Sequence, residues 1–138
     1  EYYLTDAIRL LIESGRRASA YTAKDPTTVL GANDCKQLNE LNAIAREKIL
    51  ERHMTDGVSI PCIDGVLIGP DVKIGHYTTI LPGTILCGDT VIGENCMLGP
   101  NTFLQDTKVG ADAILNSVQV YSQTLADKTE LLPFSVLK

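Results

Sequence analysis

The sequence predicts a mainly β protein in which stacked, three-sided coils of short parallel strands follow a long helix. Three observations predict this fold. An aliphatic residue returns at every sixth position from Ile68 to Leu104. A small or branched residue follows most of these positions four places later, and glycine often follows them directly. A period of six matches neither the helical period of about 3.6 residues nor the alternation of an ordinary half-buried strand.

The composition limits the class of protein. The chain has 138 residues, of which 44% are hydrophobic and 5% aromatic, without Trp, so its core must be aliphatic. A formal net charge of −5 gives no overall basic bias toward nucleic acid, and no apolar run approaches the ~20 residues of a membrane span. The four cysteines form no C-x-x-C pair and are interpreted as free thiols, which favours a cytoplasmic location. The first residue is Glu1 rather than Met, which we interpret as a piece of a longer protein.

The first third of the chain shows helical signals. Thr5 or Asp6 is the expected cap of a helix whose apolar face carries Ile8 and Leu11, and Gly15 is its expected end. The segment "RASAYTA", residues 17–23, alternates enough to predict a strand, and a loop follows it.

A second helix is expected after Asp34, its predicted N-cap, and Gly57 is its predicted end. Its length of roughly twenty residues favours a connector rather than a core helix. The predicted apolar stripe consists of Leu38, Leu41, Ala45 and Ile49.

After Gly57 the six-residue pattern begins. Inward positions are expected to hold the aliphatic series Ile68, Ile74, Ile80, Leu86, Ile92, Leu98, Leu104, Val109, Leu115, Val120, Leu125 and Leu131. The steps after Leu104 and Leu115 are shortened to five. Glycine is expected to supply unusual backbone angles at the corners. The cramped places beside the corners are expected to hold Val72, Thr78, Thr84, Thr90, Cys96, Thr102, Thr107, Ala113, Val118, Thr124, Thr129 and Ser135.

Eighteen residues make one coil, so about four coils fit between Ile68 and Ser135. A single coil buries too little to offset its ordering entropy, and stability therefore comes from stacking on neighbours. A β-sandwich would instead demand a period of two.

This pattern resembles the hexapeptide repeat of left-handed parallel β-helices. Three further segments, "EYYLTD" at 1–6, "GAND" at 31–34 and "HMTDGV" at 53–58, precede the repeats. Together they resemble the bacterial bifunctional N-acetylglucosamine-1-phosphate uridyltransferase / glucosamine-1-phosphate acetyltransferase family. The end of the chain, "LLPFSVLK", resembles the family's "GPFA-x-LR", with Leu132 in place of Gly and Lys138 in place of Arg.

The resemblance implies a central fragment with three parts. Residues 1–33 would be the C-terminal edge of a Rossmann-like α/β uridyltransferase domain, 34–57 a linker helix, and 58–138 about four coils of an incomplete left-handed β-helix. The family forms homotrimers through this β-helix. It transfers acetyl from acetyl-CoA to glucosamine-1-phosphate, then UMP from UTP with Mg²⁺, making UDP-N-acetylglucosamine for cell-wall synthesis. The fragment alone is expected to be inactive, because neither site is complete.

Asn33 is the one site residue that the resemblance carries over, as a ligand of Mg²⁺ and a contact of the sugar nucleotide. Mg²⁺ prefers hard oxygen ligands and usually takes few from protein, which suits an amide oxygen. The alternative is that Asn33 only shapes the turn before the helix.

Other residues have weaker assignments, and none is predicted to be catalytic. Tyr3 and Thr5 border the family's sugar-nucleotide pocket, and Lys138 replaces an Arg that contacts a sugar phosphate. Lys keeps that charge but loses the bidentate geometry. His53 is expected to pack at the helix end, and His76 to face solvent.

Two other functions are open. A relative could join a nucleotidyltransferase domain to a β-helix but make another sugar nucleotide. A non-catalytic trimerisation scaffold is the second alternative.

Overall fold

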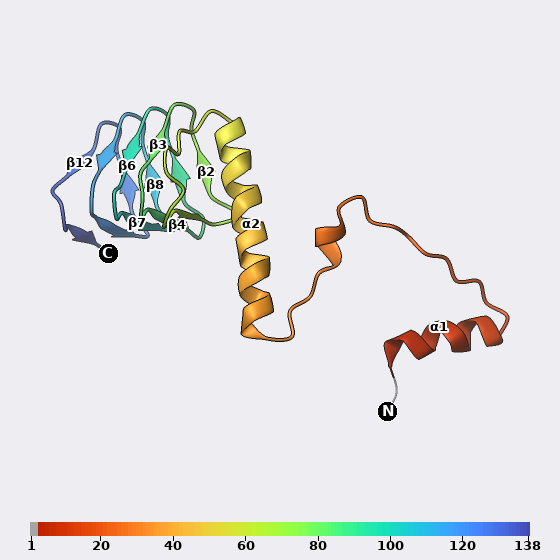
Figure 1. The fold of residues 1–138 in the computed structure, drawn as a ribbon. Helices are drawn as coiled ribbons and strands as arrows, with labels where there is room; N and C mark the ends of the chain where they lie inside the picture. Colours follow the sequence, from red (N-terminus) through yellow and green to blue (C-terminus); the bar gives the residue numbers. More distant parts are fainter. Residues whose placement is uncertain (1–2) are drawn as a thin grey trace.

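The computed structural model describes residues 3–138 (Figure 1). Three helical elements come first: α1 (Leu4–Glu13), a 3₁₀ turn η1 (Pro26–Val29) and α2 (Cys35–Thr55). Thirteen short strands follow: β1 (Leu67–Ile68), β2 (Lys73–Ile74), β3 (Thr79–Ile80), β4 (Ile85–Cys87), β5 (Val91–Ile92), β6 (Met97–Leu98), β7 (Phe103–Gln105), β8 (Lys108–Val109), β9 (Ile114–Leu115), β10 (Gln119–Tyr121), β11 (Thr124–Leu125), β12 (Glu130–Leu131) and β13 (Val136–Leu137).

The helix α1 forms as predicted, but it begins earlier. Tyr3, not Thr5 or Asp6, is its N-cap, and the Asp6 carboxylate reaches back to accept the Tyr3 backbone N–H at 3.2 Å. The predicted end at Gly15 is confirmed. Gly15 has a φ of +77°, and the Arg16 N–H donates to the Leu11 carbonyl at 3.0 Å, as in a Schellman motif.

The strand predicted for residues 17–23 is wrong, because this segment has no regular secondary structure. A strand requires a neighbour to pair with, and Figure 1 shows the segment running alone between α1 and η1. The Rossmann-like edge expected for residues 1–33 therefore stays a prediction.

An ion pair joins the start of η1 to α2. Lys48 Nζ, on α2, lies 2.6 Å from Oδ2 of Asp25, the N-cap of η1. The Lys48 hydrogen bond lowers the pKa of Asp25 to about 2.

The helix α2 has the predicted ends. The Asp34 side chain accepts the Gln37 N–H at 2.7 Å, and Gly57 follows the last turn with a φ of +84°. The predicted apolar stripe is partly wrong, because Leu38 and Ala45 are exposed, whereas Leu50 and His53 are buried. Only the C-terminal half of α2 lies against the first coil, so its covered face is set by that contact (Figure 1).

The second half is a parallel β-solenoid, which confirms the predicted coil. The strands form three parallel sheets, ordered β1-β4-β7-β10-β13, β2-β5-β8-β11 and β3-β6-β9-β12. Each coil therefore places one strand in each sheet. The predicted inward aliphatic residues form the core, with Ile74, Leu125 and Leu131 only partly buried. The left-handed sense of the coil stays a prediction.

The short steps change the length of a coil. Leu67 pairs with Ile85, 18 residues later, whereas Phe103 pairs with Gln119, only 16 residues later. A further short step, from Val120 to Leu125, follows the two predicted ones. Because of it, Thr124 is exposed rather than inward.

At three corners glycine has a different reason from the expected one, whereas Gly99, with a φ of +101°, supplies the expected unusual angle. Gly75, Gly93 and Gly110 do not have positive φ; that angle occurs two residues later, at Tyr77, Asn95 and Asp112. The glycines are required because coils stack closely there. An ideal Cβ at Gly75 would lie 2.6 Å from the Glu94 nitrogen, and one at Gly93 would lie 2.7 Å from the Ala111 nitrogen.

The buried threonines confirm the predicted small positions and add a polar function. Thr78 Oγ1 donates to the Gly93 carbonyl at 2.9 Å and accepts the Cys96 N–H at 3.0 Å. Thr90 Oγ1 likewise donates to the Cys87 carbonyl at 2.6 Å. Among the residues 3–138, no buried side-chain nitrogen or oxygen lacks a partner. The hydroxyls thus satisfy backbone groups where the chain turns.

Candidate functional site

Asn33 lies in the bend just before α2 and is exposed. Its backbone N–H donates to the Gln37 side-chain oxygen at 2.8 Å. The neighbouring Asp34 carboxylate is already used as the helix cap. The exposed Asn33 amide offers a single hard oxygen, which fits one ligand of a Mg²⁺ ion but does not make a site by itself. Within residues 3–138, no three His, Cys, Asp or Glu side chains cluster so as to hold a metal ion.

The other predicted binding residues are not brought together. Tyr3 and Thr5 lie at the start of α1, whereas Lys138 ends the last coil, and Figure 1 shows these two ends of the structure far apart. Asn33 lies between them, at the end of α2 that projects away from the solenoid. Within residues 3–138, the structure therefore does not bring these residues together into one pocket.

Both histidines lie where the sequence predicted. His53 is packed at the helix end with only 4% of its surface exposed, and His76 is exposed. His76 nevertheless has a partner that was not predicted, because its Nδ1 lies 2.7 Å from the Asp56 carbonyl oxygen. Cys96 is buried in the core, as expected, and burial raises the pKa of its thiol.

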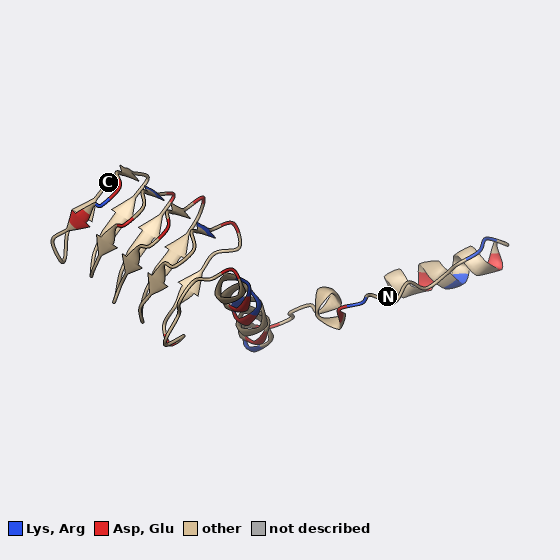
Figure 2. Cartoon of the chain, turned by 90° about the horizontal axis from the view of Figure 1, so that it is seen from above, with Lys and Arg blue, Asp and Glu red and all other residues tan. Residues whose placement is uncertain are grey.

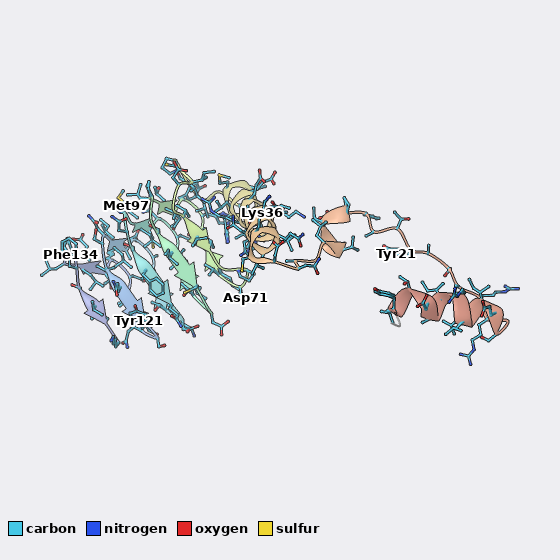
Figure 3. The ribbon with its side chains drawn as sticks, turned by 60° about the horizontal axis from the view of Figure 1, so that its bottom comes forward. Tyr21, Lys36, Asp71, Met97, Tyr121 and Phe134 are labelled. Atoms are coloured by element: carbon cyan, nitrogen blue, oxygen red, sulfur yellow. The ribbon has the colours of Figure 1, made fainter. Side chains whose placement is uncertain are left out.

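A groove that sequence reasoning missed lies between the last turn of α2 and the first two coils. It has a volume of about 530 Å³ and is lined by Arg52, His53, Asp56, Pro70, Asp71, Val72, Lys73, Ile74 and Asp89. Figure 3 shows Asp71 on the solenoid beside α2. The lining residues come from one helix end and two stacked coils, so no contiguous motif could have revealed the groove.

The electrostatics of the groove are mixed. Two cationic side chains, Arg52 and Lys73, and three carboxylates, Asp56, Asp71 and Asp89, line the groove. Burial is the main cause that lowers the pKa of His53 below its ordinary value of 6.5, and the Arg52 charge adds to it. Asp56 acts in the opposite direction. His53 is therefore neutral in the folded protein near neutral pH.

The helix α2 is held to the solenoid by arginine side chains. Arg46 Nε donates to the Val66 carbonyl at 2.8 Å, and the same guanidinium also donates to the Ile63 carbonyl. Arg52 donates to the Pro70 carbonyl at 3.2 Å. These bonds, with buried Leu50, fix the direction in which the helix leaves the first coil.

The comparisons with known proteins first define a class. Residues 71–105 match the family model "Bacterial transferase hexapeptide (six repeats)". Together with the three parallel sheets, this match shows a hexapeptide-repeat solenoid. No helix within residues 3–138 has the length and apolar character needed to cross a membrane.

The relatives then define the family. Proteins named "Bifunctional protein GlmU" from Geobacillus sp. (strain WCH70) and Bifidobacterium longum (strain DJO10A) are 36% and 39% identical to this chain over 138 residues. The protein of the same name from Fervidobacterium nodosum is 39% identical over the same length. Each match covers 100% of this chain and 30% of the relative. The family predicted from the motifs is thereby confirmed: the chain is homologous, from end to end, to one segment of the bifunctional GlmU proteins.

One solved structure is also similar in part. It is a mutant perosamine N-acetyltransferase from Caulobacter crescentus in complex with CoA and GDP-perosamine, 16% identical in sequence. The alignment covers 70% of this chain and 60% of that one, with a TM-score of 0.29. A TM-score this low supports no inference about sites or ligands.

Proposed function

We propose that this chain is the central segment of a GlmU-type bifunctional transferase. The observation that carries the proposal is the match along all 138 residues to proteins of which the chain spans about 30%. The whole enzyme would transfer acetyl from acetyl-CoA to glucosamine-1-phosphate, and UMP from UTP to N-acetylglucosamine-1-phosphate with Mg²⁺. All four cysteines are free, in agreement with the cytoplasmic location that the sequence favours.

Within that enzyme, the chain would hold two sites in a fixed relation. Residues 1–33 would complete the uridyltransferase domain, 34–57 would be the linker helix, and 58–138 would begin the β-helix. Asn33 stands at one end of α2, and the other end is bonded to the first coil through Arg46 and Arg52. The helix would thereby set the position of Asn33, the proposed Mg²⁺ and sugar-nucleotide contact, relative to the solenoid. Mg²⁺ would neutralise phosphate charge during uridylyl transfer.

The isolated 138 residues are expected to have no transferase activity, because Asn33 offers one ligand of an incomplete site. The chain is incubated with acetyl-CoA and glucosamine-1-phosphate, and separately with UTP, Mg²⁺ and N-acetylglucosamine-1-phosphate. Product is measured by mass spectrometry. Turnover above background by the purified chain would contradict the incompleteness of its sites.

The parent protein serves as the positive control and separates the alternatives. It is expected to make UDP-N-acetylglucosamine from UTP. A preference for ATP or dTTP would indicate a different sugar nucleotide. A parent without either activity would indicate a scaffold and would overturn the proposed function.

The outer surface of the solenoid supports the proposed homotrimer. The outward positions of the first sheet are mainly apolar: Leu67, Ile85, Phe103, Gln119 and Val136. The second sheet presents Thr79, Met97, Ile114 and Glu130, and its two central residues, Met97 and Ile114, are 48% and 45% exposed. The third presents Lys73, Val91, Lys108 and Thr124 instead. Figure 2 shows charged residues gathered on α2 and along the edges of the coils rather than on most strands.

This arrangement suits a threefold assembly. The mainly apolar first sheet and the apolar middle of the second sheet meet at one edge of the triangular rod, so three rods can place these edges together around an axis. The first sheet of each copy then packs against the second sheet of its neighbour. This is a heterologous contact, and three such contacts close into a ring. Phe134, in the turn between β12 and β13, is 85% exposed, and Met97 on β6 is 48% exposed; both are labelled in Figure 3. The polar third sheet would remain in solvent.

Replacing Ile114 with lysine is expected to reduce the solution mass to about one third, because it places a charge inside the apolar contact. Mass is measured by light scattering after size-exclusion chromatography. Val91→Lys is the matched control, since Val91 also points outward from a strand and is 38% exposed, but on the polar sheet. Equal masses for the two variants, or a monomeric unmodified chain, would contradict this interface.

A further inference from the structure

One guanidinium nitrogen links a buried histidine to the solenoid. Arg52 Nη2 lies 3.4 Å from His53 Nε2 and 3.2 Å from the Pro70 carbonyl oxygen. His53 and Arg52 belong to the last turns of α2, whereas Pro70 belongs to the first coil. We propose that His53, Arg52 and the Pro70 carbonyl form a proton-sensitive latch that holds the end of α2 against the first coil.

The hydrogen-bond chemistry requires a neutral His53 ring. An arginine nitrogen is a donor only, so Nε2 must act as the acceptor in this contact, and any ring proton is then on Nδ1. In the protonated ring both nitrogens are donors, and an N–H would face the N–H of a second cation. Arg52 must then move away, and its bond to the Pro70 carbonyl is lost with it.

The surroundings of His53 include both signs of charge. Asp56, the C-cap of α2, favours a protonated ring. Asp71 on the first coil, Asp89 on the second coil and Lys73 line the same groove. Burial and the adjacent Arg52 outweigh Asp56, because the pKa of His53 is lowered overall. His76, which contacts the Asp56 carbonyl, is a separate tie between the helix end and the solenoid.

The direction of the pH effect follows from proton binding. The open state, with His53 in water, takes up a proton near its ordinary pKa of 6.5, whereas the latched state does so only at lower pH. Opening is therefore independent of pH above about 6.5 and becomes more favourable as the pH falls below that value, by up to about tenfold per pH unit. The groove gives water and protons access to the ring.

Hydrogen exchange of the whole chain tests the latch. Exchange is followed by mass spectrometry at about pH 7.5 and about pH 5.5, with correction for the intrinsic pH dependence of exchange. Peptides that cover the last turns of α2 are expected to lose protection by up to about tenfold per pH unit below 6.5. Peptides from β6 and β7 are expected to keep theirs, because their coil does not include the latch.

Two histidine variants make the test specific. In His53→Gln, an amide oxygen can still accept a hydrogen bond from Arg52 but does not titrate. The pH-dependent loss of exchange protection in α2 should therefore disappear. His76→Gln removes the only other histidine and should leave the loss unchanged. A loss that persists in H53Q, or that disappears in H76Q, would overturn the latch.

A titration of the unmodified chain provides a measurement that does not depend on the folding of a variant. The ring signals of His53 and His76 are followed by proton NMR. The α2 amide signals are expected to change together with the His53 titration. If His53 titrates at or above 6.5, or without any change in those amides, the latch is contradicted.

Discussion

Replacing Leu98 with alanine is expected to lower the free energy of unfolding by about 3–5 kcal/mol. Leu98 is fully buried in β6, in the middle of the stack. Its carbonyl accepts the Leu81 N–H at 2.8 Å, and the following Gly99 N–H donates to the Leu115 carbonyl at 2.8 Å. Backbone bonded on both sides cannot collapse into the space that the lost side chain leaves. The full cost of the cavity should therefore appear.

The measurement is urea unfolding followed by circular dichroism. Val91→Ala is the matched control, because Val91 precedes the inward Ile92 on β5, points outward with 38% exposure, and lies on the polar sheet outside the proposed trimer contact. It should change the free energy of unfolding by less than about 1 kcal/mol. A similar loss in both variants would show that the inward and outward positions had been assigned incorrectly.

The inward positions could be predicted because each is set by local repetition. Ile80, Leu98 and Leu115 lie at equivalent buried positions in successive coils. The repeat of aliphatic residues in the sequence therefore predicts the coil directly. The ends of α2 at Asp34 and Gly57 could also be predicted, because a capping side chain and a terminating glycine act within one turn of the helix.

The failures come from contacts that the local sequence does not contain. Residues 17–23 alternate like a strand, but no neighbour pairs with them. The stripe on α2 follows the helical period, yet Leu38 is exposed, because only the C-terminal half of the helix meets the solenoid.

The candidate site was predictable only in part. Asn33 could be singled out from a contiguous motif, and the structure places it in an exposed bend. Its role as a metal ligand stays a prediction, and within residues 3–138 no three His, Cys, Asp or Glu side chains gather to hold a metal ion. The groove around His53 could not be found in this way. Its walls carry Asp71 and Asp89, which are 18 residues apart in sequence and lie one above the other only after the coils stack.

Gly93→Ala is expected to lower the free energy of unfolding by about 2–3 kcal/mol, although it adds a single methyl group. The new Cβ would lie 2.7 Å from the Ala111 nitrogen and from the Gly110 carbonyl carbon, both backbone atoms of the next coil. The coils cannot separate to make room without lengthening the bond from the Gly93 N–H to the Val109 carbonyl, now 2.9 Å.

The comparison variants separate stacking from backbone angle as the reason for glycine. Gly31→Ala, at a glycine with no atom within 4 Å of an ideal Cβ, should change the unfolding free energy by less than about 0.5 kcal/mol. Asn95→Gly, at a φ of +57°, should be tolerated within about 1 kcal/mol, because glycine accepts this angle freely. Urea unfolding of all three variants gives the ranking. If Gly93→Ala proved as harmless as Gly31→Ala, close stacking of the corners would not be what demands glycine there, and the spacing of the coils would have to be wider than the structure shows.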